Sequence, residues 1–283
     1  MFAQKMVQQS PVEKRCEADG QKLDTQFENR ESLVEYVAAI SPWTPERSPS
    51  PFFGGSSAAQ ERLVGIDPIR YARTRNYLKG AVSRLSPYIR HGVVTLEEVR
   101  RHAVASAGGP KRIEKFIQEL AWRDYWQRVY AAHPDWIWHS IEPYKTGWDE
   151  SDYREELPDD IEAASTDVAC INSFIQMLQS TGYLHNHARM YLAAYIVHWR
   201  RVRWQTGARW MMSWLLDGDP ASNNLSWQWV ASTFSRRPYI FNLANVQKYT
   251  GPDIDTRPEA NRALDGSYAE LSTQLFPKLG VER

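Results

Sequence analysis

Apolar residues recur at helical spacing from about residue 61 onward, and no part of the chain alternates apolar and polar positions convincingly as a strand would. The clearest case is 111–133, where the three- and four-residue spacing continues until Pro134. Shorter helices are predicted over 33–40, 167–180, 184–200 and 207–216. The predicted fold class is therefore all-α.

Residues that favour helix ends support this division. Ser86 followed by Pro87 is typical of an N-cap and a first helical position. Thr95 and Glu98 form a capping-box pattern that opens the next helix. Two later helices are expected to end near glycines, at Gly182 and Gly218.

Three regions follow from composition along the chain. Residues 1–60 are rich in Ser, Pro, Gln and Gly and are expected to form a partly irregular N-terminal extension. Residues 61–250 form the predicted helical domain, which the acidic stretch 148–165 interrupts as a surface connection. Residues 251–283 are expected to be a C-terminal tail with a short helix.

Composition indicates a soluble protein, with 24% charged residues and a mean hydropathy of −0.56. The longest apolar run, 190–197, is far shorter than the ~20 residues of a membrane span. The N-terminus lacks the apolar segment of a secretory signal, so a cytoplasmic location without membrane association is expected. Cys16 and Cys170 have no metal-site spacing, and motifs of serine hydrolases, P-loop proteins and zinc proteases are absent from the sequence.

Charge is strongly separated along the chain although the net charge is zero. Residues 62–128 hold 14 Lys and Arg against 6 Asp and Glu, and 185–210 hold five Arg and no acid. Residues 149–167, by contrast, hold nine acids and one Arg. The basic stretches would attract a polyanion, because local potential rather than total charge decides attraction. They are equally consistent with ordinary solvated surface.

The long predicted helix carries an unusual stripe of Glu119, Trp122, Arg123 and Trp126, which share one face. The stripe is consistent with an amphipathic edge at which Trp packs and the charges stay in water. A ligand-facing stripe is favoured, because other positions of the helix already supply a core face: Ile113, Phe116, Ile117 and Leu120.

Two histidines raise the question of a metal site in 181–204. His185 and His187 are two residues apart, so on a helix they would point in nearly opposite directions, and no metal is expected. Asn186 and Met190 share a helix face.

The stretch 215–233, LLDGDPASNNLSWQWVAST, combines two aspartates, two adjacent asparagines and two tryptophans. It is expected to be loop-like, and it is too polar and too aromatic to be only core. With 12 Trp and 25 Arg in the chain, indoles are available to stack on planar ligands and guanidinium groups to hold phosphates. A nucleotide-like cofactor, a nucleic acid, or both are indicated.

Four motifs together, SRLSPYIRHG, QELAWRDYW, STGYLHNHARM and LLDGDPASNNLSWQWVAST, resemble the FAD-binding helical domain of the photolyase/cryptochrome family. The resemblance runs from about Tyr71 to Tyr249, in the order of the family. It implies an all-α domain around FAD. Larger members carry an antenna domain before this one, so a short, photolyase-like protein without an antenna domain is expected.

The resemblance also implies which residues contact FAD. Tyr71, Ser83, Leu85 and Ser86 match positions at its phosphates and ribityl chain, and the predicted helix start at Ser86 would independently suit an anion. The other implied flavin contacts are Arg123, the ion pair of Arg189 with Asp217, Asp219 at the polar edge of the ring, and Asn223 facing N5. Asparagine at this last position resembles the DNA-repair branch.

For the substrate, the resemblance implies cyclobutane pyrimidine dimers in UV-damaged DNA. The positions that match a lesion pocket are Glu119, Trp122, Asn186, Met190 and Trp229. Excited, reduced FAD would donate an electron to the flipped-out dimer. Glu119 would stabilise the radical anion, while Trp122 and Trp229 would stack on the bases.

Trp227 and Trp204 match the first two members of the family's electron-hopping chain, and Trp148 is the candidate for the third because Ser151 occupies the matching position. Light-driven dimer repair by a photolyase is the main hypothesis. A cryptochrome-like photoreceptor without repair activity and a flavin-free, helical nucleic-acid-binding module are the alternatives.

Overall fold

The structure is a computed structural model in which residues 23–41 and 49–280 are described. Its contacts divide the chain into two compact units, Met1–Pro49 and Ser50–Arg283. The described part of the first unit contains one helix, α1 (Arg30–Ile40), which confirms the helix predicted over 33–40. A capping box between Asn29 and Ser32 opens α1.

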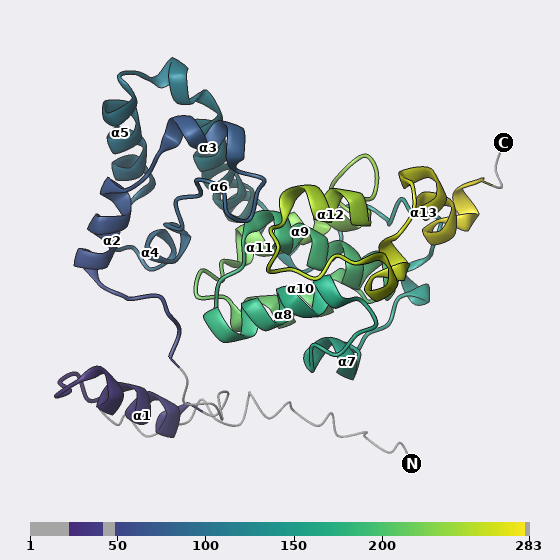
Figure 1. The fold of residues 1–283 in the computed structure, drawn as a ribbon, viewed down its shortest axis with the longest axis horizontal. Helices are drawn as coiled ribbons and strands as arrows, with labels where there is room; N and C mark the ends of the chain where they lie inside the picture. Colours follow the sequence, from purple (N-terminus) through teal and green to yellow (C-terminus); the bar gives the residue numbers. More distant parts are fainter. Residues whose placement is uncertain (1–22, 42–48, 281–283) are drawn as a thin grey trace, which may run out of the picture. The chain divides into compact units, whose positions relative to one another are not determined.

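The second unit is built from helices, with only an isolated bridge between Arg154 and Val202 and no strand in the described ranges, so the all-α fold is confirmed (Figure 1). A π-helical turn, Tyr195–Trp199, continues α9. The helices of this unit are α2 (Ser56–Val64), α3 (Pro68–Thr74), α4 (Ser86–Arg90), α5 (Leu96–Ala107), α6 (Glu114–Ala132), α7 (Asp159–Glu162), α8 (Ala169–Thr181), α9 (Asn186–Ala194), α10 (Trp204–Trp214), α11 (Pro220–Ala231), α12 (Leu243–Tyr249) and α13 (Tyr268–Leu275).

Two hydrophobic clusters stabilise this unit. The smaller cluster joins α2 to α6 through buried side chains such as Leu63, Val99 and Phe116. The larger cluster joins α7 to α12, with Phe174 and Trp204 fully buried. Helix α11 packs against α6, α9 and α10 and so connects the two clusters (Figure 1).

Segments placed outside 61–250 by composition also pack within this unit. The Ser50 hydroxyl donates a hydrogen bond to the Thr181 carbonyl, and Trp199 Nε1 donates one to the Ala263 carbonyl at 2.8 Å. The predicted short helix of the tail is α13. None of the described helices is both long and apolar enough to cross a membrane.

Two helix ends were predicted correctly from local motifs. Thr95 and Glu98 form the expected capping box of α5, and Gly182 ends α8 with a left-handed φ of 68°. The prediction for Ser86 was wrong, because Leu85 is the N-cap and Ser86 is the first residue of α4. The contact of Ser86 with FAD that the resemblance implies stays a prediction.

The predictions for Gly218 and for the stretch 215–233 were also wrong. Helix α10 ends at Trp214 with Leu215 as its C-cap, so Gly218 lies beyond the cap in a turn. The stretch 215–233 is mostly helix rather than loop, because Asp219 accepts a hydrogen bond from the backbone of Ser222 and starts α11 with Pro220 at its first position.

Candidate functional site

A cavity of about 560 Å³ lies among helices α3, α4, α6, α9, α10 and α11 and their connections, with side chains of both hydrophobic clusters in its wall. Most of the predicted site residues line it: Tyr71, Ser83, Ser86, Glu119, Trp122, Arg123, Asn186, Arg189, Met190, Asp217, Asp219, Asn223, Trp227 and Trp229. Leu85 and Trp204 do not. Leu85 is buried in the smaller cluster and Trp204 in the larger one.

Asp217, a deeply buried acid of the cavity, forms an ion pair with Arg189. Arg189 Nη2 lies 3.0 and 2.8 Å from the two carboxylate oxygens of Asp217, whose side chain is only 3% exposed. Arg189 Nε also donates a hydrogen bond to the Leu184 carbonyl, which fixes the guanidinium plane. Burial opposes ionisation of Asp217, but Arg189 and the Ser86 hydroxyl outweigh it, so its pKa is lowered and the carboxylate stays charged.

Asp219 is held just as firmly at the start of α11. Its carboxylate accepts hydrogen bonds from the backbone and the hydroxyl of Ser222, and from Gln127 Nε2 at 2.9 and 2.8 Å. Arg123 lies 4.0 Å away. The N-cap role and the contacts with α6 therefore position the same side chain.

The amide side chains of α11 fix that helix in place. Asn223 donates from Nδ2 to the Ala208 carbonyl and to Asn224 Oδ1. Asn224 in turn donates to the Ile137 carbonyl, and Gln228 binds the backbone of Trp136, His139 and Ile141. These bonds give Asn224 and Gln228 a structural role that their sequence pattern does not reveal.

His185 and His187 both line the cavity. His185 is the N-cap of α9 rather than a residue within the helix, so the helical spacing used to separate the two rings does not apply. Its Nδ1 accepts a hydrogen bond from the His187 backbone, which leaves the proton on Nε2. Burial, and then the neighbouring His187 and Arg189, lower the pKa of His185 to about 4. No group of three metal-ligating side chains is found in the described residues.

The lining divides by exposure: we call the part around Asp217 and Asp219 the buried end of the cavity, and the part around Glu119, Trp122 and Trp229 the exposed end. Trp122 is 49% and Trp229 is 40% exposed. Glu119 is held on its Oε1 by Arg75 Nη1 at 3.3 Å and by Lys115 Nζ at 2.8 Å. Asn186 Nδ2 lies 3.7 Å from the sulfur of Met190, so these two do share a face.

The three candidate electron-transfer tryptophans occupy different environments. Trp227 lines the cavity and packs so closely on Gly207 that a Cβ at that position would overlap its ring. Trp204 is fully buried, with its Nε1 donating to the Ser140 hydroxyl. The Trp148 ring lies outside the cavity, with the cations of Arg201 and Lys278 each 4.5 Å from its centroid. Their electron-transfer roles stay a prediction.

Sequence reasoning missed three polar contacts of the site. Lys115 precedes Glu119 by one helical turn, a spacing from which the ion pair could have been expected. Arg75 reaches Glu119 from the end of α3, and Gln127 reaches Asp219 across 92 positions. No local pattern indicates these last two contacts.

Comparisons with known proteins agree with this geometry. The sequence profile described as "FAD binding domain of DNA photolyase" matches residues 116–256. Deoxyribodipyrimidine photo-lyase of Streptomyces griseus is 33% identical over 236 residues, which cover 79% of this chain and 50% of that protein. The corresponding protein of Escherichia coli is 32% identical over 133 residues, which cover 46% of this chain and 28% of that protein. The chain thus spans about half the length or less of these curated relatives.

Solved structures give the same result. An archaeal photolyase from Sulfolobus tokodaii with two FAD molecules superimposes with a TM-score of 0.60 at 25% identity, covering 82% of this chain and 52% of that one. A Synechocystis cryptochrome shares the fold, with a TM-score of 0.61 at 23% identity. The match covers 71% of this chain and 44% of that one. Fold, cavity and profile together define a helical FAD-binding domain. The chain belongs to the photolyase/cryptochrome family. The expectation about an absent antenna domain stays a prediction.

FAD is therefore the cofactor, and the cavity fits it. Arg189 and the carboxylates of Asp217 and Asp219 line the cavity and supply fixed donors and acceptors for a polar ring system. Arg189, Asp217, Asp219 and Asn223 would hold the flavin.

Proposed function

We propose that this chain repairs cyclobutane pyrimidine dimers in DNA with light and FAD. The observation that carries the proposal is a single cavity with two chemically different ends. One end holds the buried pair of Arg189 and Asp217, and the other holds Glu119 beside exposed tryptophans. Relatives named deoxyribodipyrimidine photo-lyase support the same reading.

Each exposed side chain has a task in this proposal. FAD, when bound and reduced, supplies an electron on illumination and takes it back after the ring has split. Glu119 accepts hydrogen bonds from the pyrimidine N–H groups, and Trp122 and Trp229 stack on the extruded bases. Asn186 and Met190 also line the cavity. Exposed arginines hold the phosphate backbone, so affinity falls as salt concentration rises.

The decisive experiment measures loss of dimers from a short irradiated oligonucleotide under near-UV or blue light, with reductant and with flavin content verified by absorption. We expect dimers to disappear in the light and to persist in the dark. Persistence of dimers under full flavin reduction would contradict repair and favour a photoreceptor. A Glu119→Ala variant should keep FAD and repair more slowly, because the side chain lies away from the buried ion pair.

A further inference from the structure

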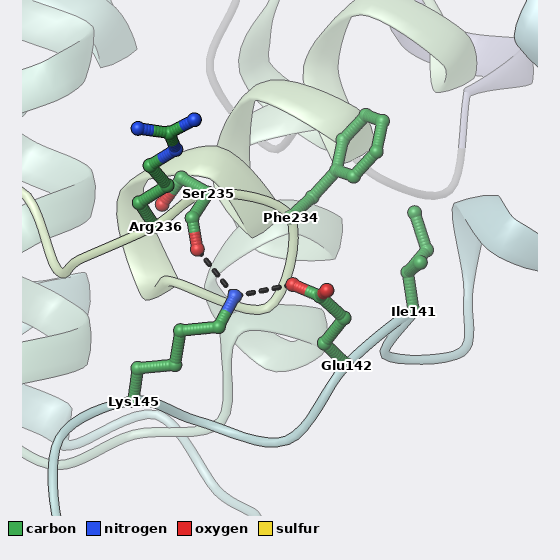
Figure 2. Close-up of a pocket in the computed structure, with 6 residues that line it drawn as sticks. All are labelled: Ile141, Glu142, Lys145, Phe234, Ser235 and Arg236. Atoms are coloured by element: carbon green, nitrogen blue, oxygen red, sulfur yellow. Dashed lines mark hydrogen bonds and ion pairs between the residues drawn. The ribbon is translucent and has the colours of Figure 1, made fainter.

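A second, shallower pocket of about 480 Å³ lies on the surface next to the main cavity. Its lining residues are Ile141, Glu142, Lys145, Phe234, Ser235 and Arg236 (Figure 2). The two pockets share a wall of aromatic rings: Trp126 lines the main cavity, Phe234 lines the surface pocket, and their ring centroids are 5.8 Å apart. An occupant of the main cavity could therefore continue into the surface pocket.

Aromatic rings extend in both directions from this wall. Trp122 stacks on Trp126 at 5.3 Å on the cavity side. On the other side Phe234 contacts Trp136 at 6.3 Å, and Trp136 stacks on His133 at 3.8 Å with nearly parallel rings. A series of partly exposed ring faces suits successive bases of a nucleic-acid strand, because every base has a face that can stack.

The charges around the surface pocket favour an anion. Glu142 is the only acid among its lining residues, and the Lys145 ammonium pairs with it and with the Ser235 carbonyl (Figure 2). The same ammonium also donates to the Ser232 carbonyl. Arg236 and Arg237 are exposed, and neither guanidinium has an ion pair or hydrogen-bond partner in the described part of the chain. Figure 2 shows the Arg236 guanidinium pointing away from Lys145. Two cations thus remain for phosphate groups.

We propose that the surface pocket binds the unpaired nucleotide next to the lesion on the same strand, so that the preferred substrate is a dimer in single-stranded DNA. The inference rests on the proposed repair function. The base stacks on Phe234, and Arg236 and Arg237 hold the adjoining phosphates. In a duplex the same base would first have to leave its partner and its stack, which costs free energy. A single strand does not carry this cost.

The test compares the affinity of the FAD-loaded protein for three ligands carrying the same thymine dimer: a bare dinucleotide, a single strand with two nucleotides on each side, and that strand in a duplex. We expect the flanked single strand to bind most tightly. Phe234→Ala and Arg236→Gln should each weaken its binding about fivefold to tenfold and leave the dinucleotide unchanged. A duplex that binds as tightly as the single strand would overturn the inference.

Control variants separate the loss of a contact in the surface pocket from a change in overall charge or folding. Arg262→Gln removes one exposed charge that lines neither pocket and should leave all three affinities unchanged. Phe234→Tyr keeps an aromatic ring and should bind like the parent protein. Unchanged affinity of Phe234→Ala for the dinucleotide excludes misfolding as the cause of the alanine result. An abasic site is placed first on one side of the dimer and then on the other. We expect weaker binding for only one of the two positions. Unchanged binding for both positions would overturn the inference. Repair of the bare dinucleotide under light tests the proposed function separately.

Discussion

The two ends of the main cavity differ in how firmly their side chains are held. At the buried end, Asp217 and Asp219 each have several partners, and both carboxylates are almost completely shielded from solvent. At the exposed end, Glu119 has two ion pairs that share one oxygen. Trp122 packs against the rings of Tyr125 and Trp126, while about half of its surface faces solvent.

This difference matches what each end must do. A site for a permanently bound group benefits from side chains that are already locked in position, because nothing then has to be ordered on binding. A site for a substrate that enters and leaves needs side chains that can adjust. Substitutions at the buried end should therefore affect stability and FAD content, whereas those at the exposed end should affect only the substrate.

The largest effect is expected from Arg189→Leu. The substitution leaves the Asp217 carboxylate buried without its partner, which typically costs about 3–5 kcal/mol. The protein should lose FAD and melt at a clearly lower temperature, measured by absorption and thermal unfolding. The matched control is Arg200→Leu, because Arg200 is equally buried but its partner Asp160 is 36% exposed. Equal destabilisation by both variants would show that burial of the carboxylate is not what matters.

Mild acid should act at the same end through His185. Burial lowers the pKa of His185 to about 4, below the ~6.5 of an unfolded histidine, so between these values the unfolded chain binds more protons. Stability therefore falls as pH drops from 6.5 toward 4 and is fully present above 6.5. We expect the melting temperature of the FAD-loaded protein to fall between pH 7 and pH 5, and less so in His185→Asn. Identical curves for both proteins would contradict this role.

Local sequence motifs predicted only some of the helix ends that position these residues. The capping box at Thr95 and the cap at Gly182 depend on a few neighbouring residues and were predicted correctly. The stretch 215–233 was not, because its polar residues suggested a loop. In the fold those side chains satisfy distant backbone groups, as Asn224 does at Ile137 and Gln228 at His139. A sequence pattern cannot show a partner almost ninety positions away.

The residues that line the cavity were predicted more completely than the helix ends. They were predicted from the family resemblance and not from the spacing of apolar residues. The motifs identified residues on both clusters that line one space, which spacing along a single helix cannot do. Leu85 and Trp204 are the exceptions, since both are buried in hydrophobic clusters outside the lining. Arg75 and Gln127 were missed because their contacts depend on the packing of α3 and α11 against α6.

An intermediate effect is expected at the exposed end from Trp229→Ala. Removal of a stacking face typically costs about 1–3 kcal/mol per base, so affinity for a dimer-containing oligonucleotide should fall roughly fivefold or more. FAD content and melting temperature should stay close to those of the parent protein, because the ring is 40% exposed. Loss of FAD in this variant would contradict the division of the cavity into two ends.

The smallest effect is expected from Lys115→Met, which removes one of the two cations on Glu119 while Arg75 remains. Arg128→Met is the matched control, because Arg128 pairs with Asp124 on the same helix with the same four-residue spacing. The Lys115 pair is partly exposed, so Lys115→Met should lose no more than about 0.5 kcal/mol of stability, and Arg128→Met should melt like the parent protein because its pair is fully exposed. Only Lys115→Met should change repair kinetics. Because Glu119 would be less firmly oriented toward the dimer, the rate of dimer splitting should fall about twofold to threefold at saturating substrate, a range on the scale of one such ion pair. If both variants slow repair equally, the effect belongs to helix α6 as a whole and not to the orientation of Glu119.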